Sequence, residues 1–241
     1  MHRIETISPP ASGFWNFRLR DAEGVVFALA SDANPLASGF EIPFDDVLPD
    51  VAAVVRTGWL DGRHDPEARI FQAGFRTWAQ AGRDAYDEAI ARVAHLARGA
   101  GREVWLWPHA RHVLGDAQRV LTETRDWDDA SPFRVMLEPT AMLTPSMLDA
   151  AEDHLLRIVD TLADSPRTAC VLISDAELVE IDPSKAPAGT SPGPELRSVP
   201  VGHGVLGAAV LAKIAAAADS AGATLLLHDD ALDDQRAIIG V

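Results

Sequence analysis

Short apolar runs recur along this chain with helical patterns between them, and no other feature constrains the fold as strongly. The clearest runs lie at 104–107, 133–138, 168–174 and 223–227. Runs that are almost wholly apolar, without alternation, are typical of parallel strands that are buried on both faces and connected by helices. Ligands of such proteins collect at the carboxyl ends of the strands. The sequence therefore predicts an α/β protein with a pocket at these strand ends.

Each run leads into a polar side chain that can act as an acid, a base or a metal ligand: His109, Glu138, Asp175 and His228. Glu138 is the strongest candidate, because a charged group after an apolar run costs free energy unless it is paired or coordinating. Pro139 also keeps Glu138 out of a helix interior. Two structural alternatives stay open, a loop histidine bonded to a backbone carbonyl for His109 and a turn former for Asp175.

Other polar or aromatic residues near these runs are candidates for contacts with a substrate. We predict Trp107, His112, His203 and Asp229 as substrate-binding residues, although His112 also fits the start of the next helix. His203 lies between two glycines, which allow close backbone approach to a ligand but do not form a phosphate-loop signature. The segment 61–65, DGRHD, suits a metal or sugar hydroxyls, and it equally suits a solvated turn.

Segments with helical periodicity connect the predicted strands. The expected helices cover 66–99, 113–124, 144–162 and 205–220. The proline- and glycine-rich stretch 181–197 predicts a long loop, of the kind that often forms a lid or a binding element.

The two ends of the chain are less regular. Residues 1–50 predict short strands and loops, because prolines and glycines interrupt the apolar runs. A buried strand is expected at 51–57, and a short acidic tail after residue 230.

Composition narrows the classes of protein that fit. A chain of 241 residues is the usual length of one α/β barrel, so we expect a single domain over 1–241. The net charge of −15 opposes nucleic-acid binding, which needs clustered Lys and Arg.

The lone Cys170 lies in an apolar run and is expected to be a buried, inert thiol. With no signal-peptide pattern and no apolar stretch of membrane-spanning length, we expect a cytoplasmic protein without membrane contact. The oligomeric state is left open.

The order of these segments resembles the xylose isomerase-like barrels of the sugar phosphate isomerase/epimerase superfamily. The resemblance is carried by EVWLWPHA, VMLEPTAML, VLISDAE, SVPVGHGVLGAAVLAKI and ATLLLHD, within about residues 80–230. It implies a (β/α)₈ TIM barrel with an irregular N-terminal third. It also implies one divalent metal ion, Mn²⁺, Mg²⁺, Co²⁺ or Zn²⁺, held by acids and histidines at the strand ends.

By this resemblance, the chain is a metal-dependent isomerase or epimerase that moves a proton next to the carbonyl of a small ketose or hydroxy-ketone. Glu138 and His109 take the catalytic positions, and the expected metal ligands are Glu138, His109, Asp175 and His228. Two departures stand against this assignment. His228 lies where the last strand of the family usually presents a glutamate, and VLISDAE lacks the family's His-x-His-x-Lys-Asp segment.

Two alternatives follow from these departures. The chain is a barrel of the same descent that binds a sugar-like ligand or a protein partner without metal or catalysis, or it is a metal-dependent hydrolase or lyase that uses a bound water.

Overall fold

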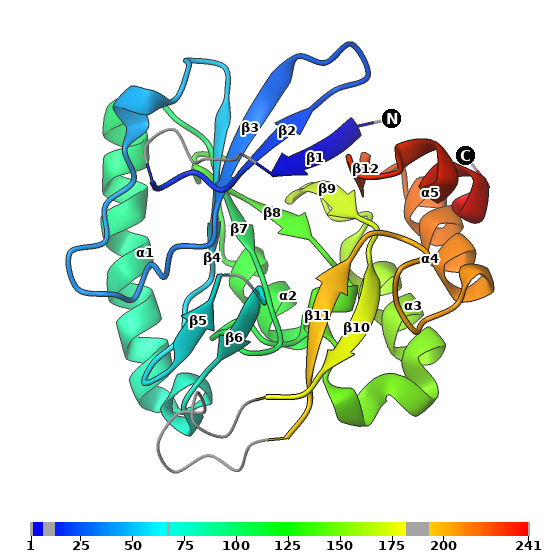
Figure 1. The fold of residues 1–241 in the computed structure, drawn as a ribbon. Helices are drawn as coiled ribbons and strands as arrows, with labels where there is room; N and C mark the ends of the chain where they lie inside the picture. The colour runs from blue at the N-terminus through cyan, green and yellow to red at the C-terminus, as the bar shows by residue number, and fades with distance from the viewer. Residues whose placement is uncertain (1, 7–12, 67, 182–192, 241) are drawn as a thin grey trace.

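The computed structural model describes residues 2–6, 13–66, 68–181 and 193–240, and its strands close into a barrel (Figure 1). Around the barrel the strands follow the order β1 (His2–Thr6), β12 (Leu225–His228), β9 (Thr168–Leu172), β8 (Phe133–Leu137), β7 (Val104–Trp107), β4 (Ala52–Arg56), β3 (Val26–Ser31) and β2 (Phe17–Arg20). Neighbours are parallel except at β1–β2 and β2–β3, which are antiparallel. The expected barrel with an irregular N-terminal third is confirmed.

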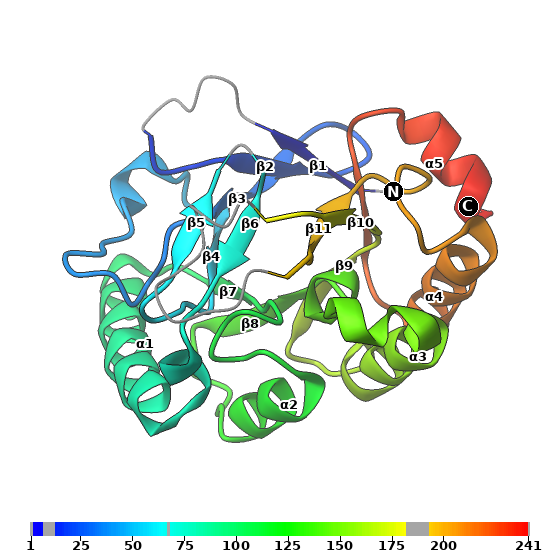
Figure 2. The same ribbon diagram turned by 60° about the horizontal axis from the view of Figure 1, so that its bottom comes forward.

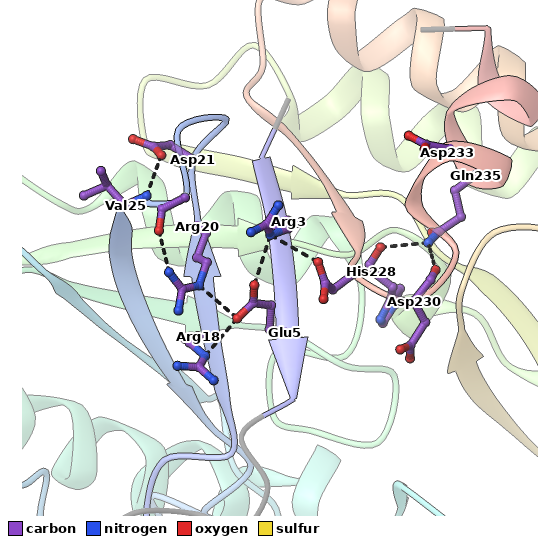
Figure 3. Close-up of polar contacts among 12 residues, drawn as sticks. Arg3, Glu5, Arg18, Arg20, Asp21, Val25, His228, Asp230, Asp233 and Gln235 are labelled. Carbon is purple, nitrogen blue, oxygen red and sulfur yellow. Dashed lines mark hydrogen bonds and ion pairs between the residues drawn. The ribbon is translucent and has the colours of Figure 1, made fainter.

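The irregular third needs no crossover helix, because antiparallel strands can be joined by tight turns. The outward-facing side chains of β1 and β2 include a charged cluster. Glu5 on β1 forms ion pairs of 3.0, 2.9 and 2.9 Å with Arg3, Arg18 and Arg20 (Figure 3). Arg3 also pairs with Asp229 at 3.1 Å, next to β12. This charged face replaces the apolar outer surface that a covering helix would need.

Helices surround the parallel strands from α1 to α4, as Figure 2 shows. The helices are α1 (Gln80–Ala100), α2 (Ala117–Arg125), α3 (Ala151–Leu162), α4 (Ala208–Ser220) and α5 (Leu232–Ile239), and short 3-10 segments are η1 (Phe44–Asp46), η2 (Phe75–Trp78), η3 (Thr140–Met142) and η4 (Pro145–Ala150). Their apolar faces pack on the outside of the barrel and form the larger of the two main cores. The second core fills the barrel itself with Ile4, Phe17, Leu19, Ala28, Ala30, Ala52, Val54, Trp105, Trp107, Met136, Cys170, Leu172 and Leu226. Cys170 is buried and free, as expected, and its burial raises the pKa of the thiol.

The expected helix over 66–99 is wrong in its first part. A hairpin of β5 (Arg63–Asp65) and β6 (Ile70–Gln72) precedes η2, and α1 begins only at Gln80. Gly62 fixes this hairpin, because a Cβ there would lie 1.8 Å from the carbonyl oxygen of Gln72. The clear helical period of the sequence begins only near Ala85, so it does not extend to the hairpin.

Two further expectations need correction. Part of the predicted loop 181–197 is a strand, since β11 (Glu195–Val199) pairs antiparallel with β10 (Asp175–Val179), while 182–192 lie outside the described residues. The predicted acidic tail contains α5, which buries Ile239 and Gln235. In both cases pairing with a distant segment supplies the stability that the local sequence does not indicate.

The two hairpins stand at the mouth of the barrel. β5–β6 follows the carboxyl end of β4, and β10–β11 follows that of β9. The hairpins lie side by side in both views of Figures 1 and 2, and β6 contacts β11. They therefore flank the strand ends where the sequence predicts a site.

Candidate functional site

A buried ion pair lies at the centre of the barrel mouth. Arg56, the last residue of β4, donates from Nε to Oδ1 of Asp32 at 2.8 Å, and its Nη2 lies 2.6 Å from the same oxygen. Asp32 follows β3, and the two side chains are only 3% and 8% exposed. Charges this deeply buried require pairing, because isolated ions lose several kcal/mol of hydration. The pair is therefore a fixed feature of the mouth.

Aromatic rings hold the guanidinium of Arg56 in place. Its Cζ lies 3.3 Å from the centre of the Trp107 ring and 4.6 Å from that of Phe71. Burial lowers the pKa of Arg56, whereas the charges of Asp32 and Glu138 act in the opposite direction. Arginine keeps its proton at neutral pH even when buried, so the mouth contains a permanent cation. Burial opposes the charge of Asp32, but the charges of Arg56 and Arg69 keep the pKa of Asp32 below its usual value.

Glu138 lies beside this pair at the end of β8 and is 1% exposed. Both of its carboxylate oxygens accept hydrogen bonds, from Trp107 Nε1 at 2.9 Å and from Ser174 Oγ at 2.9 Å. The carboxylate that the sequence singles out is thus at the predicted place. Trp107, a predicted substrate contact, is fully buried and connects Glu138 to the Arg56 guanidinium.

The two predicted histidines after β7 lie together in an aromatic cluster. The rings of His109 and His112 are 5.0 Å apart, and His112 stacks on Trp59 with 5.0 Å between ring centres. His64 from the β5–β6 hairpin joins them by stacking on Phe71 at 4.2 Å. His109 accepts a hydrogen bond at Nδ1 from the backbone N–H of Arg111 at 3.0 Å. This nitrogen therefore already has a partner within the protein.

These imidazoles are held in the neutral form. Burial lowers the pKa of His109 and of His112 well below the usual value, and nearby cationic groups add to the effect. Burial also lowers the pKa of His64, with Asp32 partly opposing it. At neutral pH the cluster therefore offers neutral nitrogens, which can donate or accept a hydrogen bond according to tautomer.

Asp175 organises a loop near residues 204–206. Its carboxylate accepts hydrogen bonds from the backbone N–H groups of Ala176, Gly204 and Leu206 at 2.7, 3.0 and 3.0 Å. A Cβ on Gly204 would lie 2.5 Å from Asp175 Oδ1, so glycine permits this approach. Asp175 therefore fits the role of a turn former, which the sequence left open as an alternative.

The other predicted residues are spread around the barrel. His228 ends β12, with its backbone carbonyl accepting from Gln235 of α5 at 2.7 Å (Figure 3). Burial lowers the pKa of His228 to about 3. His203 is exposed in the turn before α4, and Asp229 is exposed and paired with Arg3.

The predicted metal ligands do not fit a common ion. In the described part of the chain, no group of three or more His, Cys, Asp or Glu side chains is placed to hold a metal. Both Glu138 oxygens and both Asp175 oxygens already accept hydrogen bonds from separate partners. Among the described residues, His109, Glu138, Asp175 and His228 are thus not gathered around one point, and Asp175 binds the backbone of residues 204–206.

Sequence reasoning missed the ion pair and the second cation of the site. Arg56 lies next to the end of the buried run 51–57, and Asp32 follows the run 25–30. The rule that singled out Glu138, a charge placed after an apolar run, applies equally to both. Arg69 carries no such signal, because the hairpin that brings it to the mouth lies where the sequence suggested a helix.

Arg69 is the second cation of the mouth. Its Cζ lies 4.6 Å from the centre of the Phe17 ring, which belongs to the barrel interior. Its charge acts on Asp32, His64 and His228. Within the described residues its buried Nε has no hydrogen-bond partner. The same holds, over that part of the chain, for Arg56 Nη1, Thr57 Oγ1, His64 Nε2 and His228 Nε2.

Comparison with known proteins gives structural matches only. No family model matches the chain, and no curated protein does. A xylose isomerase-like TIM barrel protein from Mycobacterium smegmatis, in complex with magnesium, is similar at 13% identity and a TM-score of 0.47, covering 79% of this chain and 60% of that one. A probable 3-DHS dehydratase from Bacillus anthracis, involved in petrobactin synthesis, is similar at 15% identity and a TM-score of 0.49, covering 90% and 75%.

A xylose isomerase domain protein from Planctomyces limnophilus is similar at 12% identity and a TM-score of 0.40, covering 78% of this chain and 59% of that one. The chain thus spans about three fifths of the length of the mycobacterial and planctomycete proteins. The resemblance expected from the sequence is found again among these solved structures. None of the described helices is long and apolar enough to span a membrane.

Proposed function

We propose that the barrel mouth binds a small, hydroxylated anion, such as a sugar acid or a sugar phosphate, without a divalent metal. The observation that carries this proposal is the set of buried polar atoms without partners around Arg69. Buried polar groups in folded proteins are almost always hydrogen-bonded. Among the described residues, Arg56 Nη1, Thr57 Oγ1, His64 Nε2, Arg69 Nε, His228 Nε2 and both ring nitrogens of His112 are such atoms at the mouth, and together they favour a ligand that satisfies them.

The chemistry of these atoms indicates the class of ligand. Arg56 Nη1 and Arg69 Nε can only donate, and both belong to cations, which suits a carboxylate or phosphate oxygen. The neutral rings of His64 and His228 and the hydroxyl of Thr57 suit sugar hydroxyls, which both donate and accept. Arg69 also has a φ of 53°, a strained backbone conformation for a residue other than glycine. Such strain is concentrated at functional sites.

Metal-dependent isomerisation receives less support. That reaction needs a metal and a second acid or base on the opposite side of the reacting carbon. The sequence supplies Glu138 for one role, but its carboxylate is bound by Trp107 and Ser174. Two further carboxylates at the strand ends already have other partners, since Asp32 is held by Arg56 and Asp175 by backbone groups.

The test is ligand binding in the presence of a chelator. Sugar acids, sugar phosphates and the matching uncharged sugars should be titrated into the protein in EDTA by calorimetry and thermal unfolding. We expect anionic sugars to bind and the uncharged ones to bind more weakly. Arg69→Met should reduce the affinity about tenfold to a hundredfold, the value of a charge-assisted hydrogen bond.

Arg63→Met is the matched control, since Arg63 lies in the same hairpin but is exposed. It should bind as the wild type does. If no anionic sugar binds in EDTA, or if binding appears only with a divalent metal, the proposal is wrong. Equal affinity of Arg69→Met and wild type would also contradict it.

A further inference from the structure

The contacts of Arg56 suggest a role beyond ligand binding. Its guanidinium is enclosed by Asp32, Trp107 and Phe71, and only Nη1 lacks a partner within the described residues. Two acids act on it, Asp32 by direct contact and Glu138 through space. These acids come from the ends of β3 and β8, at different positions around the barrel. A single cation thus compensates two carboxylates, which β3 and β8 deliver to the mouth.

A buried carboxylate needs hydrogen-bond donors or a positive partner, and a protein can supply the positive partner as a metal ion or as a side chain. Asp32 and Glu138 are 7% and 1% exposed, so bulk water does not solvate them. A divalent ion beside a guanidinium would be repelled, because like charges in a buried site interact strongly. Each Glu138 oxygen and Asp32 Oδ1 also already accept hydrogen bonds.

We infer that Arg56 is a built-in cation that excludes divalent metal from this barrel mouth, and that its removal turns Asp32 and Glu138 into metal ligands. This inference does not depend on the identity of the ligand proposed above. It accounts for the poor fit of the predicted metal ligands, because the acid that matches best, Glu138, already lies beside a permanent positive charge.

The experiment measures Mn²⁺ binding to the whole chain by calorimetry, with metal content after dialysis as a second readout. Wild type should bind no Mn²⁺ in the mouth. Arg56→Met, which keeps the length of the apolar stem, should unfold at lower temperature in EDTA and gain about 5 °C or more with Mn²⁺ in excess. Arg56→Lys retains the cation and should show no such gain.

A second variant tests whether Asp32 is one of the residues that bind the metal. Arg56→Met combined with Asp32→Asn removes one ligand and should lose the Mn²⁺ effect. If Arg56→Met does not fold even with Mn²⁺, Arg56→Gln replaces it in the same comparison, because glutamine retains a neutral donor. Mn²⁺ binding by wild type that Asp32→Asn or Glu138→Gln abolishes would overturn the inference. So would a folded arginine-free variant that gains no more from Mn²⁺ than wild type does.

Failure of this inference is distinct from failure of the proposed function. Sugar binding is measured in EDTA with Arg56 intact, whereas the metal experiment needs no sugar. A wild type that binds sugars in EDTA and also binds Mn²⁺ at Asp32 would reject only the inference about Arg56.

Discussion

At the scale of single residues, two acids that occupy equivalent positions in the sequence have different hydrogen-bond partners in the structure. Glu138 and Asp175 both follow apolar runs, yet Glu138 faces Trp107 and Ser174 inside the mouth, while Asp175 binds backbone N–H groups of residues 176, 204 and 206. The reason is that β10 starts at Asp175 and turns the chain into a hairpin. The position of an acid after a strand therefore predicts that its carboxylate has binding partners, but it does not predict which partners these are.

Asp175→Ala should lower the free energy of unfolding by about 2–4 kcal/mol, because the backbone donors lose a buried acceptor. Urea denaturation in EDTA measures this loss, and the exposed Asp164→Ala serves as the control with little change. If Asp175 held a metal instead, Mn²⁺ would stabilise wild type and not the variant. That result would contradict the structural role.

At the scale of elements, the β5–β6 hairpin and the loop after β7 form the histidine cluster together. His64 and Phe71 come from the hairpin, and His109 and His112 from the loop. The rings contact one another across these elements at 4.2–5.0 Å. Because the packed rings exclude water, the imidazoles stay neutral, and the stability of the cluster should depend on pH.

The sign of this dependence follows from the lowered pKa of His112. The unfolded state takes up a proton near pH 6.5 and the folded state does not, so stability is full above that pH and falls as the pH decreases. For the fully buried His112 this loss of stability should grow as the pH is lowered from 6.5 to 5. Urea denaturation across this range measures it.

His112→Phe keeps an aromatic ring on Trp59 and removes the titrating group. We expect its stability to fall less steeply with decreasing pH than that of wild type. The exposed His95→Gln should leave the slope unchanged. An identical slope for His112→Phe and wild type would show that the ring is not held neutral by burial.

At the scale of the whole molecule, the barrel closes where β1 lies between β12 and β2. This closure joins the two ends of the chain, and its outer face bears the cluster of Glu5 with Arg3, Arg18 and Arg20 (Figure 3). Burial opposes the charge on Glu5, but the hydrogen bonds of Arg20 and Arg3 outweigh it and lower the pKa of the carboxyl group. The stabilisation is therefore present above the unfolded-state pKa of about 4.3 and is lost as the pH falls.

Glu5→Gln should lower the free energy of unfolding by at most about 1 kcal/mol, because solvent screens these partly exposed pairs. The difference should shrink in 1 M salt, where the Debye length is about 3 Å. Urea denaturation at low and high salt measures both effects, with Glu88→Gln on the exposed face of α1 as the control. A loss that does not change with salt would indicate packing rather than charge.

The sequence by itself determined the parallel strands and the helices that surround them. Near-continuous apolar runs and helical periods reflect the need of each strand and helix to bury particular faces, so β4, β7, β8, β9, β12 and the helices α1 to α4 follow from them with shifted boundaries. The same logic identified Glu138, since an unpaired charge after RVML is costly wherever the chain folds.

Only the tertiary structure decided the character of the site. Arg56 meets Asp32 across neighbouring strands, Arg69 reaches the mouth from a hairpin, and Asp175 is drawn to a loop near residue 204. These contacts join residues that are far apart in the chain, and their free energies depend on burial and distance, which local patterns do not encode. The pattern of residues thus placed acids and histidines at the strand ends, whereas packing determined that Arg56 lies among them and pairs with Asp32.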